Sequence, residues 1–256
     1  MKLKTGINGL DSYCEGVRSG EIDVCSYVKQ AVDRHYRDLQ RSQDNDPTFP
    51  YYFEPKAAIH FFEFCATLNQ YEGEFAGKPI ILEPCQQFWF GSIFGWLDKE
   101  TKYRRYRECH IEVPKKNGKS LIGAAIALYG LDWDNEPGAQ IYNLGTNRSH
   151  VMKLSYRAAE RIVKNTPELA AKFIINRGMA TMGIRYEEND SIFEPLTSKP
   201  TSLDGFNVHM FIADETKDWA DHSVWNLLDD GTISRRQPLA MSITTAGSNR
   251  SSLGYE

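Results

Sequence analysis

The sequence predicts an α/β fold in which helices flank a mostly parallel central sheet, with a small helical part ahead of it. Two observations carry this prediction. A β-type run at residues 108–113 leads through a basic, glycine-bearing turn into an apolar helical run at 121–131. Two later apolar strands, at 207–215 and 238–247, end in acidic or hydroxyl residues. Strands that alternate with helical segments are typical of parallel sheets.

Composition sets the broad class of protein. The chain has 256 residues, 41% of them hydrophobic and 25% charged, which suffices for one large core and an appendage. The longest apolar run is too short to cross a bilayer, and the first residues lack the apolar segment of a signal peptide. Five cysteines without C-x-x-C spacing indicate reduced packing residues. We therefore expect an intracellular protein that does not contact a membrane.

The charge pattern limits the contact that this chain makes with nucleic acid. A net charge of −4 argues against a protein that coats nucleic acid with its whole surface. A local basic cluster is present at 99–107, and it is either a solvated hairpin or a DNA contact. Its members are Lys99, Lys102, Arg104, Arg105 and Arg107.

The N-terminal part reads as helical. Apolar residues recur with helical spacing over 21–40, a polar loop follows at 43–50, and Pro55 opens a second helix that should end near Gly73. We expect residues 1–75 to form a helical adjunct or lid, and residues 76–256 to form the core.

A glutamine precedes the core. An extended piece ends at Pro84, where an aromatic-rich helix begins, and Gln86 lies in its first turn. A glutamine upstream of a phosphate site can offer an acceptor and a donor to adenine, which would favour ATP. Equally, Gln86 can cap the helix, and the sequence leaves both readings open.

The basic turn reads as a phosphate-binding loop. In such a loop backbone N–H groups cradle phosphate at a helix N-terminus, a lysine contacts the β/γ-phosphates, and a hydroxyl coordinates Mg²⁺. Val113 stands where the usual first glycine would be, so a plain strand-turn-helix with a solvated tip is the alternative. The expected binding residues are Pro114, Lys115, Lys116, Asn117, Gly118, Lys119 and Ser120, with Ser120 also on the metal.

Between this loop and the acidic strand lie a β-α unit and a hairpin. Residues 140–145 are strand-like, and 147–164 form an amphipathic pattern with helical spacing. Short strands at 182–185 and 191–194 flank an acidic turn. These elements add strands and a helix to the same sheet.

The acidic strand carries the second set of candidate residues. A buried parallel strand would deliver Asp214 to its carboxyl end to hold Mg²⁺, and Glu215 would activate the attacking water. The alternative is a strand that ends before a solvated loop. The position of these residues, downstream of a phosphate loop, favours the catalytic reading.

The last strand ends in Thr244 and Thr245, which are expected to hydrogen-bond the γ-phosphate or the water. A helix at 219–230 precedes it, and a connection bearing Arg235 and Arg236 follows that helix. A buried strand before a turn is the simpler interpretation of the threonines. A surface pair is the simpler interpretation of the arginines.

Taken together, these stretches resemble the ATPase domain of the large terminase subunit of tailed bacteriophages. The matching pieces are Pro84-Cys85-Gln86-Gln87-Phe88, then 104–129, then 202–205 leading to Asp214-Glu215, and Thr244-Thr245-Ala246-Gly247. The resemblance covers most of residues 77–250. It implies a P-loop NTPase fold of the ASCE type that uses ATP and Mg²⁺.

The resemblance also implies roles for single residues. Gln86 would read adenine, Lys119 and Ser120 would bind phosphate and Mg²⁺, Asp214 would bind Mg²⁺, and Glu215 would be the catalytic carboxylate. The Thr244-Thr245 pair would couple hydrolysis to movement.

One departure leaves the charge-stabilising group open. Where several relatives have an arginine before the glycine that precedes the acidic strand, this chain has Asp204. The candidates that replace it are Lys115 or Lys116 acting in cis, and Arg235 or Arg236 acting on a neighbouring subunit.

For the whole protein, the resemblance implies a motor that moves double-stranded DNA into a procapsid in the cytoplasm of a bacterial host. Its partners would be the DNA, the procapsid portal protein, the small terminase subunit and copies of itself in a ring, with a monomer in isolation. The family's C-terminal nuclease strands do not occur in this sequence, and its last residues, 251–256, suggest a longer natural chain. The alternatives are a regulatory nucleotide-binding module and a helicase-like DNA-dependent ATPase, although no helicase arginine motif follows Thr245.

Overall fold

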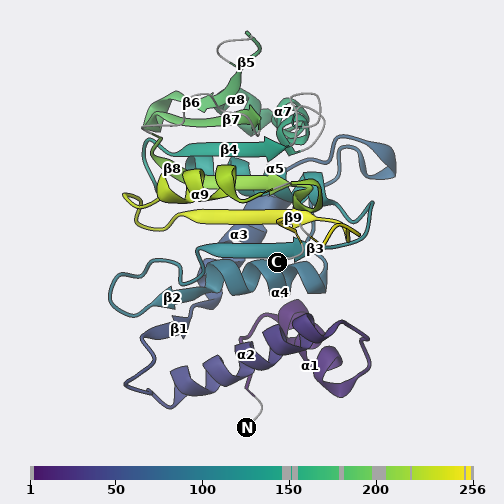
Figure 1. Ribbon diagram of the computed structural model, residues 1–256, viewed down its shortest axis with the longest axis vertical. Helices are drawn as coiled ribbons and strands as arrows, with labels where there is room; N and C mark the ends of the chain where they lie inside the picture. Colours follow the sequence, from purple (N-terminus) through teal and green to yellow (C-terminus); the bar gives the residue numbers. More distant parts are fainter. Residues whose placement is uncertain are drawn as a thin grey trace. The chain divides into compact units, whose positions relative to one another are not determined.

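The structure is a computed structural model in which the chain forms two compact units, each made of discontinuous segments (Figure 1). Unit 1 comprises Met1–Ala66 and Ile81–Arg107, and unit 2 comprises Thr67–Ile80 and Glu108–Glu256. The residues that it describes are 3–145, 151, 155–178, 182–197, 206–219, 221–250 and 252–254.

Unit 1 consists of helices and a short antiparallel strand pair. Its elements are α1 (Asn8–Ser19), α2 (Ser26–Gln43), β1 (Tyr51–Phe53), α3 (Pro55–Thr67), α4 (Pro84–Gly95) and β2 (Trp96–Asp98). The single helix predicted over 21–40 is wrong at its start: Gly20, with φ of 81°, ends α1, and α2 begins at Ser26. Glycine adopts this left-handed conformation without steric cost, which explains the break. The helix that opens at Pro55 ends at Thr67 instead of Gly73.

The core of unit 1 is aromatic and contains a buried histidine. His35 packs edge-on against Phe53, Phe88 and Trp96, and it accepts a hydrogen bond at Nδ1 from Trp96 Nε1 (3.2 Å). Burial lowers the pKa of His35 to about 4, since the charged imidazolium loses its hydration. The neutral ring therefore belongs to the folded state.

Part of the basic cluster belongs to this core. Arg105 donates to Asp38 at 2.7 Å, and its guanidinium lies over the rings of Tyr51 and Trp96. Arg104 is 4% exposed. These two arginines are packing residues, so neither reading offered for the cluster, solvated hairpin or DNA contact, describes them.

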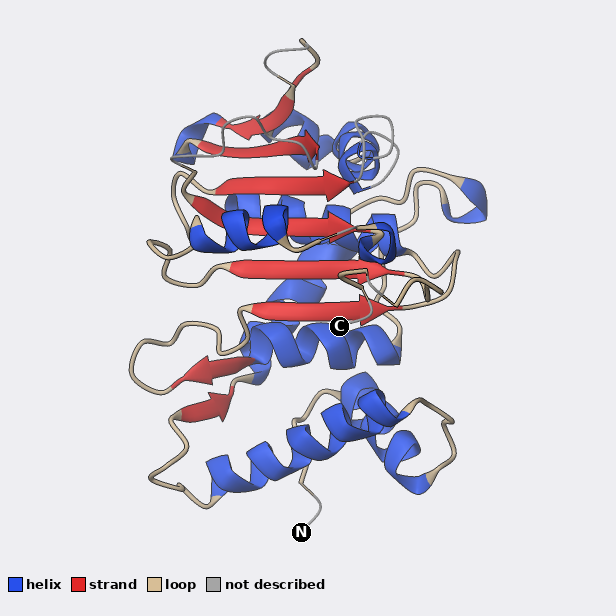
Figure 2. Ribbon diagram, in the orientation of Figure 1, coloured by secondary structure: helices blue, strands red, loops and turns tan. Residues whose placement is uncertain are grey.

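Unit 2 is built on a seven-stranded sheet in the order β3-β9-β8-β4-β7-β6-β5. Neighbours from β3 to β7 are parallel, and β6 and β5 are added antiparallel. The strands are β3 (Glu108–Glu112), β4 (Gln140–Gly145), β5 (Ile174–Asn176), β6 (Gly183–Tyr186), β7 (Ser191–Thr197), β8 (Val208–Asp214) and β9 (Leu239–Thr244). The mostly parallel α/β fold and the hairpin β6–β7 are confirmed (Figure 2).

Helices cover both faces of this sheet. The helices are α5 (Lys119–Asp132), α7 (Ser155–Asn165), α8 (Pro167–Lys172) and α9 (Ser223–Asp230). Ile212 of β8 faces α5, whereas the preceding residue, Phe211, packs against Trp225 of α9 with ring centroids 4.8 Å apart. Between Ile122 and Leu131 every residue of α5 is buried, as its apolar sequence predicts. Of the helix predicted over 147–164, residues 147–150 and 152–154 lie outside the described part.

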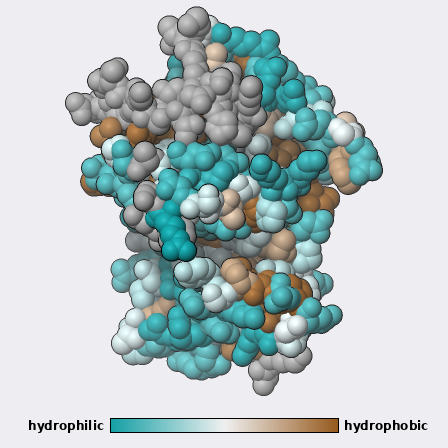
Figure 3. Space-filling model, turned by 45° about the vertical axis from the view of Figure 1, so that its right-hand side comes forward, coloured by the Kyte–Doolittle hydropathy of each residue, from teal (hydrophilic) through white to brown (hydrophobic). Residues whose placement is uncertain are grey.

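The surface visible in Figure 3 is mainly hydrophilic with scattered apolar patches. The large apolar side chains that are exposed are Tyr27, Phe75, Ile81, Ile174 and Ile233. Within the described residues, each helix is too short or too polar to cross a membrane.

Candidate functional site

The sheet topology of unit 2 brings three predicted motifs to one edge. In β3, β9 and β8 the chain runs in the same direction, so their carboxyl ends lie side by side. The N–H of Val113 donates to the Thr244 carbonyl at 3.1 Å, and the N–H of Glu215 donates to the Ile243 carbonyl at 2.8 Å. The phosphate loop, the acidic pair and the threonine pair are therefore neighbours.

The loop between β3 and α5 is an exposed turn with a fixed backbone. Gly118, the N-cap of α5, has φ of 73°, and Lys116 has φ of 67°. Asn117 Nδ2 donates to the carbonyls of Pro114 (3.2 Å) and Lys115 (3.3 Å), which closes the turn. Such a turn leaves the N–H groups of the first helical turn available to an anion.

Asp214 is buried at the end of β8, 1% exposed. Its Oδ2 accepts a hydrogen bond from Ser155 Oγ at 2.7 Å, and Asn143 Nδ2 lies 3.5 Å away. Its Oδ1 is buried and has no hydrogen-bond partner in the described residues. Burial raises the pKa of Asp214 to about 6, since these hydrogen bonds offset only part of the desolvation. An unpartnered carboxylate oxygen of this kind suits a divalent cation.

The room for this arrangement comes from Gly123 on α5. A Cβ at this position would lie 2.3 Å from Ser155 Oγ, the hydroxyl that donates to Asp214. Any larger residue would displace Ser155. Helix α5 therefore contributes a close backbone approach to the site in addition to its N-terminus.

Glu215 lies between two lysines. Its Oε1 is 3.9 Å from Lys119 Nζ, and its Oε2 accepts a hydrogen bond from Lys217 Nζ at 2.5 Å. Burial would raise the pKa of Glu215, but the hydrogen bond and charge of Lys217, together with the charge of Lys119, lower it below its ordinary value. Its backbone has φ of 51°, an uncommon conformation for a residue with a side chain and one that occurs at functional sites.

The threonines contact this carboxylate from β9. Thr245 Oγ1 donates to Glu215 Oε2 at 3.3 Å and accepts from Lys217 Nζ at 2.8 Å. Thr244 Oγ1 accepts from the N–H of Lys217 at 3.3 Å. Both threonines are buried.

Gln86 lies in unit 1, and its side chain caps a helix. The N–H of Glu83 donates to Gln86 Oε1 at 3.0 Å, and Glu83 caps the first turn of α4 in return. The capping alternative is thus realised. The adenine-reading role stays a prediction.

The arginine pair lies at the other end of the strands. Arg235 donates to the carbonyls of Asn207 (3.1 Å from Nη2) and Pro137 (3.1 Å), and pairs with Glu136 at 3.6 Å. Asn207 immediately precedes β8, so Arg235 is about 20 Å from Asp214 along the seven-residue strand. Its side chain is 7% exposed, which favours an anchoring role within one chain. Arg236 is exposed.

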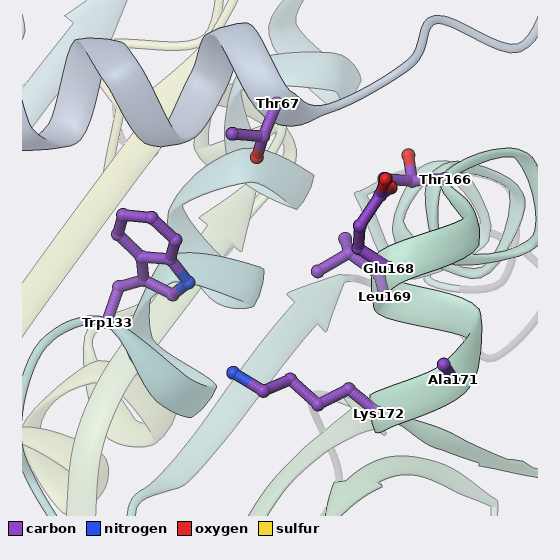
Figure 4. A pocket seen from close by; sticks show the side chains of 7 residues that line it. All are labelled: Thr67, Trp133, Thr166, Glu168, Leu169, Ala171 and Lys172. Carbon is purple, nitrogen blue, oxygen red and sulfur yellow. The ribbon is translucent and has the colours of Figure 1, made fainter.

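Other predicted features fall elsewhere. The segment 202–205, with Asp204, lies outside the described residues. A hollow of about 520 Å³ in unit 2 contains none of the candidate residues; in Figure 4 the side chains of Trp133, Leu169 and Lys172 point toward one another across it. It lies at the far end of α5, about 20 Å along the helix from the phosphate loop.

Three residues of the site were missed from the sequence: Asn143, Ser155 and Lys217. Asn143 and Ser155 are ordinary members of a strand and a helix, and only the tertiary fold brings them to Asp214. Lys217 offered a signal, since it is charged and two residues after Glu215.

Comparison with known proteins agrees with this geometry. The family model described as terminase large subunit, ATPase domain, matches residues 84–256. This match confirms the predicted resemblance and the ATPase class. No curated protein matches the sequence significantly.

Solved structures of phage large terminases share the fold. The HK97 bacteriophage large terminase has a TM-score of 0.64 and 18% identity, over 77% of this chain and 39% of that one. The Thermus phage P74-26 large terminase ATPase domain has a TM-score of 0.42 and 20% identity, over 56% of this chain and 60% of its own. For the large terminase of another thermophilic bacteriophage the values are 0.42 and 13%, over 53% and 33%. This chain thus spans about two fifths of the HK97 protein, whose similarity confirms the fold.

Proposed function

The chain belongs to the family of terminase large subunit ATPase domains, and from this membership and the site geometry we propose that it hydrolyses the β–γ bond of Mg²⁺-bound ATP to move double-stranded DNA. The observation that carries the proposal is the position of the Glu215 carboxylate. It lies 3.9 Å from the phosphate-loop lysine, Lys119, and directly follows the buried Asp214. A pure binding module has no need of a carboxylate at this position.

In this proposal the chain's own groups bind phosphate and direct a water. The N-terminus of α5 and the Lys119 ammonium hold the phosphates, with Pro114 to Ser120 forming the loop. Glu215 Oε1 accepts the proton of the attacking water. Thr244 and Thr245 link this carboxylate to β9.

A magnesium ion fits the remaining groups. Asp214 has an unpartnered buried oxygen, and the Ser120 hydroxyl at the start of α5 is the second candidate ligand. When bound, Mg²⁺ would neutralise charge on the phosphates. Asp214 and Ser155 would orient the ion's surroundings from the protein side.

The finer assignments are part of the same proposal. Gln86 reads adenine, residues 1–75 act as a lid or adjunct to the core at 76–256, and the charge-stabilising group is Lys115 or Lys116 in cis or Arg235 or Arg236 in trans. The partners are double-stranded viral DNA, the portal protein of the procapsid, the small terminase subunit and further copies in a ring. The setting is the host cytoplasm.

The deciding experiment compares the parent with Glu215→Gln. The amide keeps the shape of the side chain but does not accept a proton, so ATP and Mg²⁺ should stay bound while turnover falls by about 10²-fold or more. Turnover is measured by phosphate release with and without DNA and empty procapsids, and binding by calorimetry. Equal turnover in both proteins would remove Glu215 from the proposed role, and a parent that binds ATP without turnover would indicate a regulatory module.

A further inference from the structure

We infer that Lys217 is a positioning residue of the ATPase site, which fixes the Glu215 carboxylate against the end of β9. This inference rests on the proposed function. It assigns a role to a lysine outside the phosphate loop, and the contacts of that lysine carry it.

The two oxygens of Glu215 face different lysines. Oε1 is the one near Lys119, at 3.9 Å, and Oε2 is the one bonded to Lys217, at 2.5 Å. Because Lys119 belongs to the phosphate loop, the Oε1 side is the side of the phosphates. Lys217 therefore lies behind the carboxylate, where it can hold Glu215 but is poorly placed to contact the nucleotide.

Lys217 also bonds the neighbouring strand. Its Nζ donates to Thr245 Oγ1 at 2.8 Å, and its N–H donates to Thr244 Oγ1 at 3.3 Å. Thr245 in turn donates to Glu215 Oε2 at 3.3 Å. A closed triangle of side chains thus fixes the rotamer of Glu215 and links it to the last residues of β9.

The segment after β9 holds Lys217 in place. A Cβ on Gly247 would lie 2.8 Å from Lys217 Cβ, and one on Gly254 would lie 2.7 Å from Lys217 N. The N–H of Gly254 also donates to the Thr216 carbonyl at 3.1 Å. The lysine stem is therefore confined by backbone, which limits the positions that its ammonium group can reach.

Nucleotide binding makes this contact more important. In the ligand-free chain both lysines restrain Glu215, and its side chain is 14% exposed. Phosphates compete with Oε1 for Lys119, whereas Lys217 keeps its bond to Oε2. Lys217 is then the charged group that prevents the carboxylate from turning away from the water.

The test is a comparison of Lys217→Met in two backgrounds. In the parent background, steady-state turnover should fall about 10- to 100-fold, as expected for a displaced catalytic group, while calorimetric affinity for ATP stays within about twofold. In the Glu215→Gln background, Lys217→Met should cause no further loss. Lys217→Arg should recover part of the parent activity, because it restores the charge and a donor.

Two further variants separate positioning from a general structural effect. Gly247→Ala should reproduce part of the Lys217→Met loss, and should also lose its effect in the Glu215→Gln background. Lys164→Met, which removes a lysine paired with Glu160 on α7 at 3.3 Å, is the matched control and should turn over like the parent.

The results distinguish two failures. Parent-like turnover in Lys217→Met, or an equal loss in both backgrounds, overturns the positioning role. A loss of ATP affinity equal to the loss of turnover also overturns it, since Lys217 would then be a binding group. Failure of the proposed function appears separately, as unchanged turnover on Glu215→Gln alone.

Discussion

Replacing Asp214 with Asn should stabilise the ligand-free chain at neutral pH and remove most of its response to Mg²⁺. Asp214 is fully buried, and its pKa rises from 3.8 to about 6 on folding. At about 1.4 kcal/mol per pKa unit, this difference corresponds to about 3 kcal/mol of unfavourable free energy when the carboxylate is charged. The amide carries no charge, and its oxygen can accept the same hydrogen bond from Ser155.

The sign of the pH dependence follows from the direction of the pKa change. Below about pH 4 Asp214 is protonated in both the folded and the unfolded chain, so its charge costs nothing. As the pH rises from about 4 to 6, only the unfolded chain releases the proton, and the free energy of unfolding falls. Above about pH 6 the whole penalty is present, and a bound cation offsets it.

Urea denaturation of both proteins measures this difference. At about pH 7.5 without nucleotide, Asp214→Asn should be more stable by about 1 to 3 kcal/mol, and the difference should shrink toward zero near pH 4. ATP with Mg²⁺ should stabilise the parent strongly and the variant weakly. Asp33→Asn, at an exposed position on α2, is the control and should show neither effect. A variant less stable than the parent at pH 7.5 would refute the reasoning.

Three other predictions concern ATP binding, acid stability and the arginine pair. Lys119→Ala should abolish ATP binding measured by calorimetry, because the loop loses its lysine at the phosphates; parent-like affinity would contradict the phosphate-loop assignment. The parent should lose about 3 kcal/mol of stability in unit 1 between about pH 6.5 and 4, because the pKa of His35 falls to about 4 on folding, and Trp fluorescence of His35→Asn should show a flatter profile. Arg235→Ala should lower the free energy of unfolding by about 2 to 3 kcal/mol, because three carbonyls and Glu136 lose a partner. If the pair acts in trans, a co-assembled mixture of Glu215→Gln with the double variant Arg235→Ala/Arg236→Ala should recover turnover that neither has alone; no recovery would assign the charge-stabilising task to Lys115 or Lys116.

The sequence alone determined the elements whose signal is local. The apolar run of α5, the strand that ends at Asp214 and the Gly118-Lys119-Ser120 turn each follow from periodicity and from residue types within about ten positions. These local signals sufficed to predict a mostly parallel α/β fold with its phosphate loop at a strand end. The N-terminal helix boundary was wrong because Gly20 interrupts a pattern that otherwise continues.

Only the tertiary structure decided which side chains meet. The insertion of β9 between β3 and β8 places Thr245 and Lys217 against Glu215, and the close approach of α7 to Gly123 of α5 places Ser155 on Asp214. The Ser155 contact joins residues 59 positions apart, so no short sequence window contains it. Burial had the same character: Arg105 reads as a surface charge in a basic run, but its guanidinium packs among aromatic rings that the fold assembles from separate segments. The pKa of Asp214 likewise depends on desolvation by the whole sheet, which the residue's own neighbours in sequence do not determine.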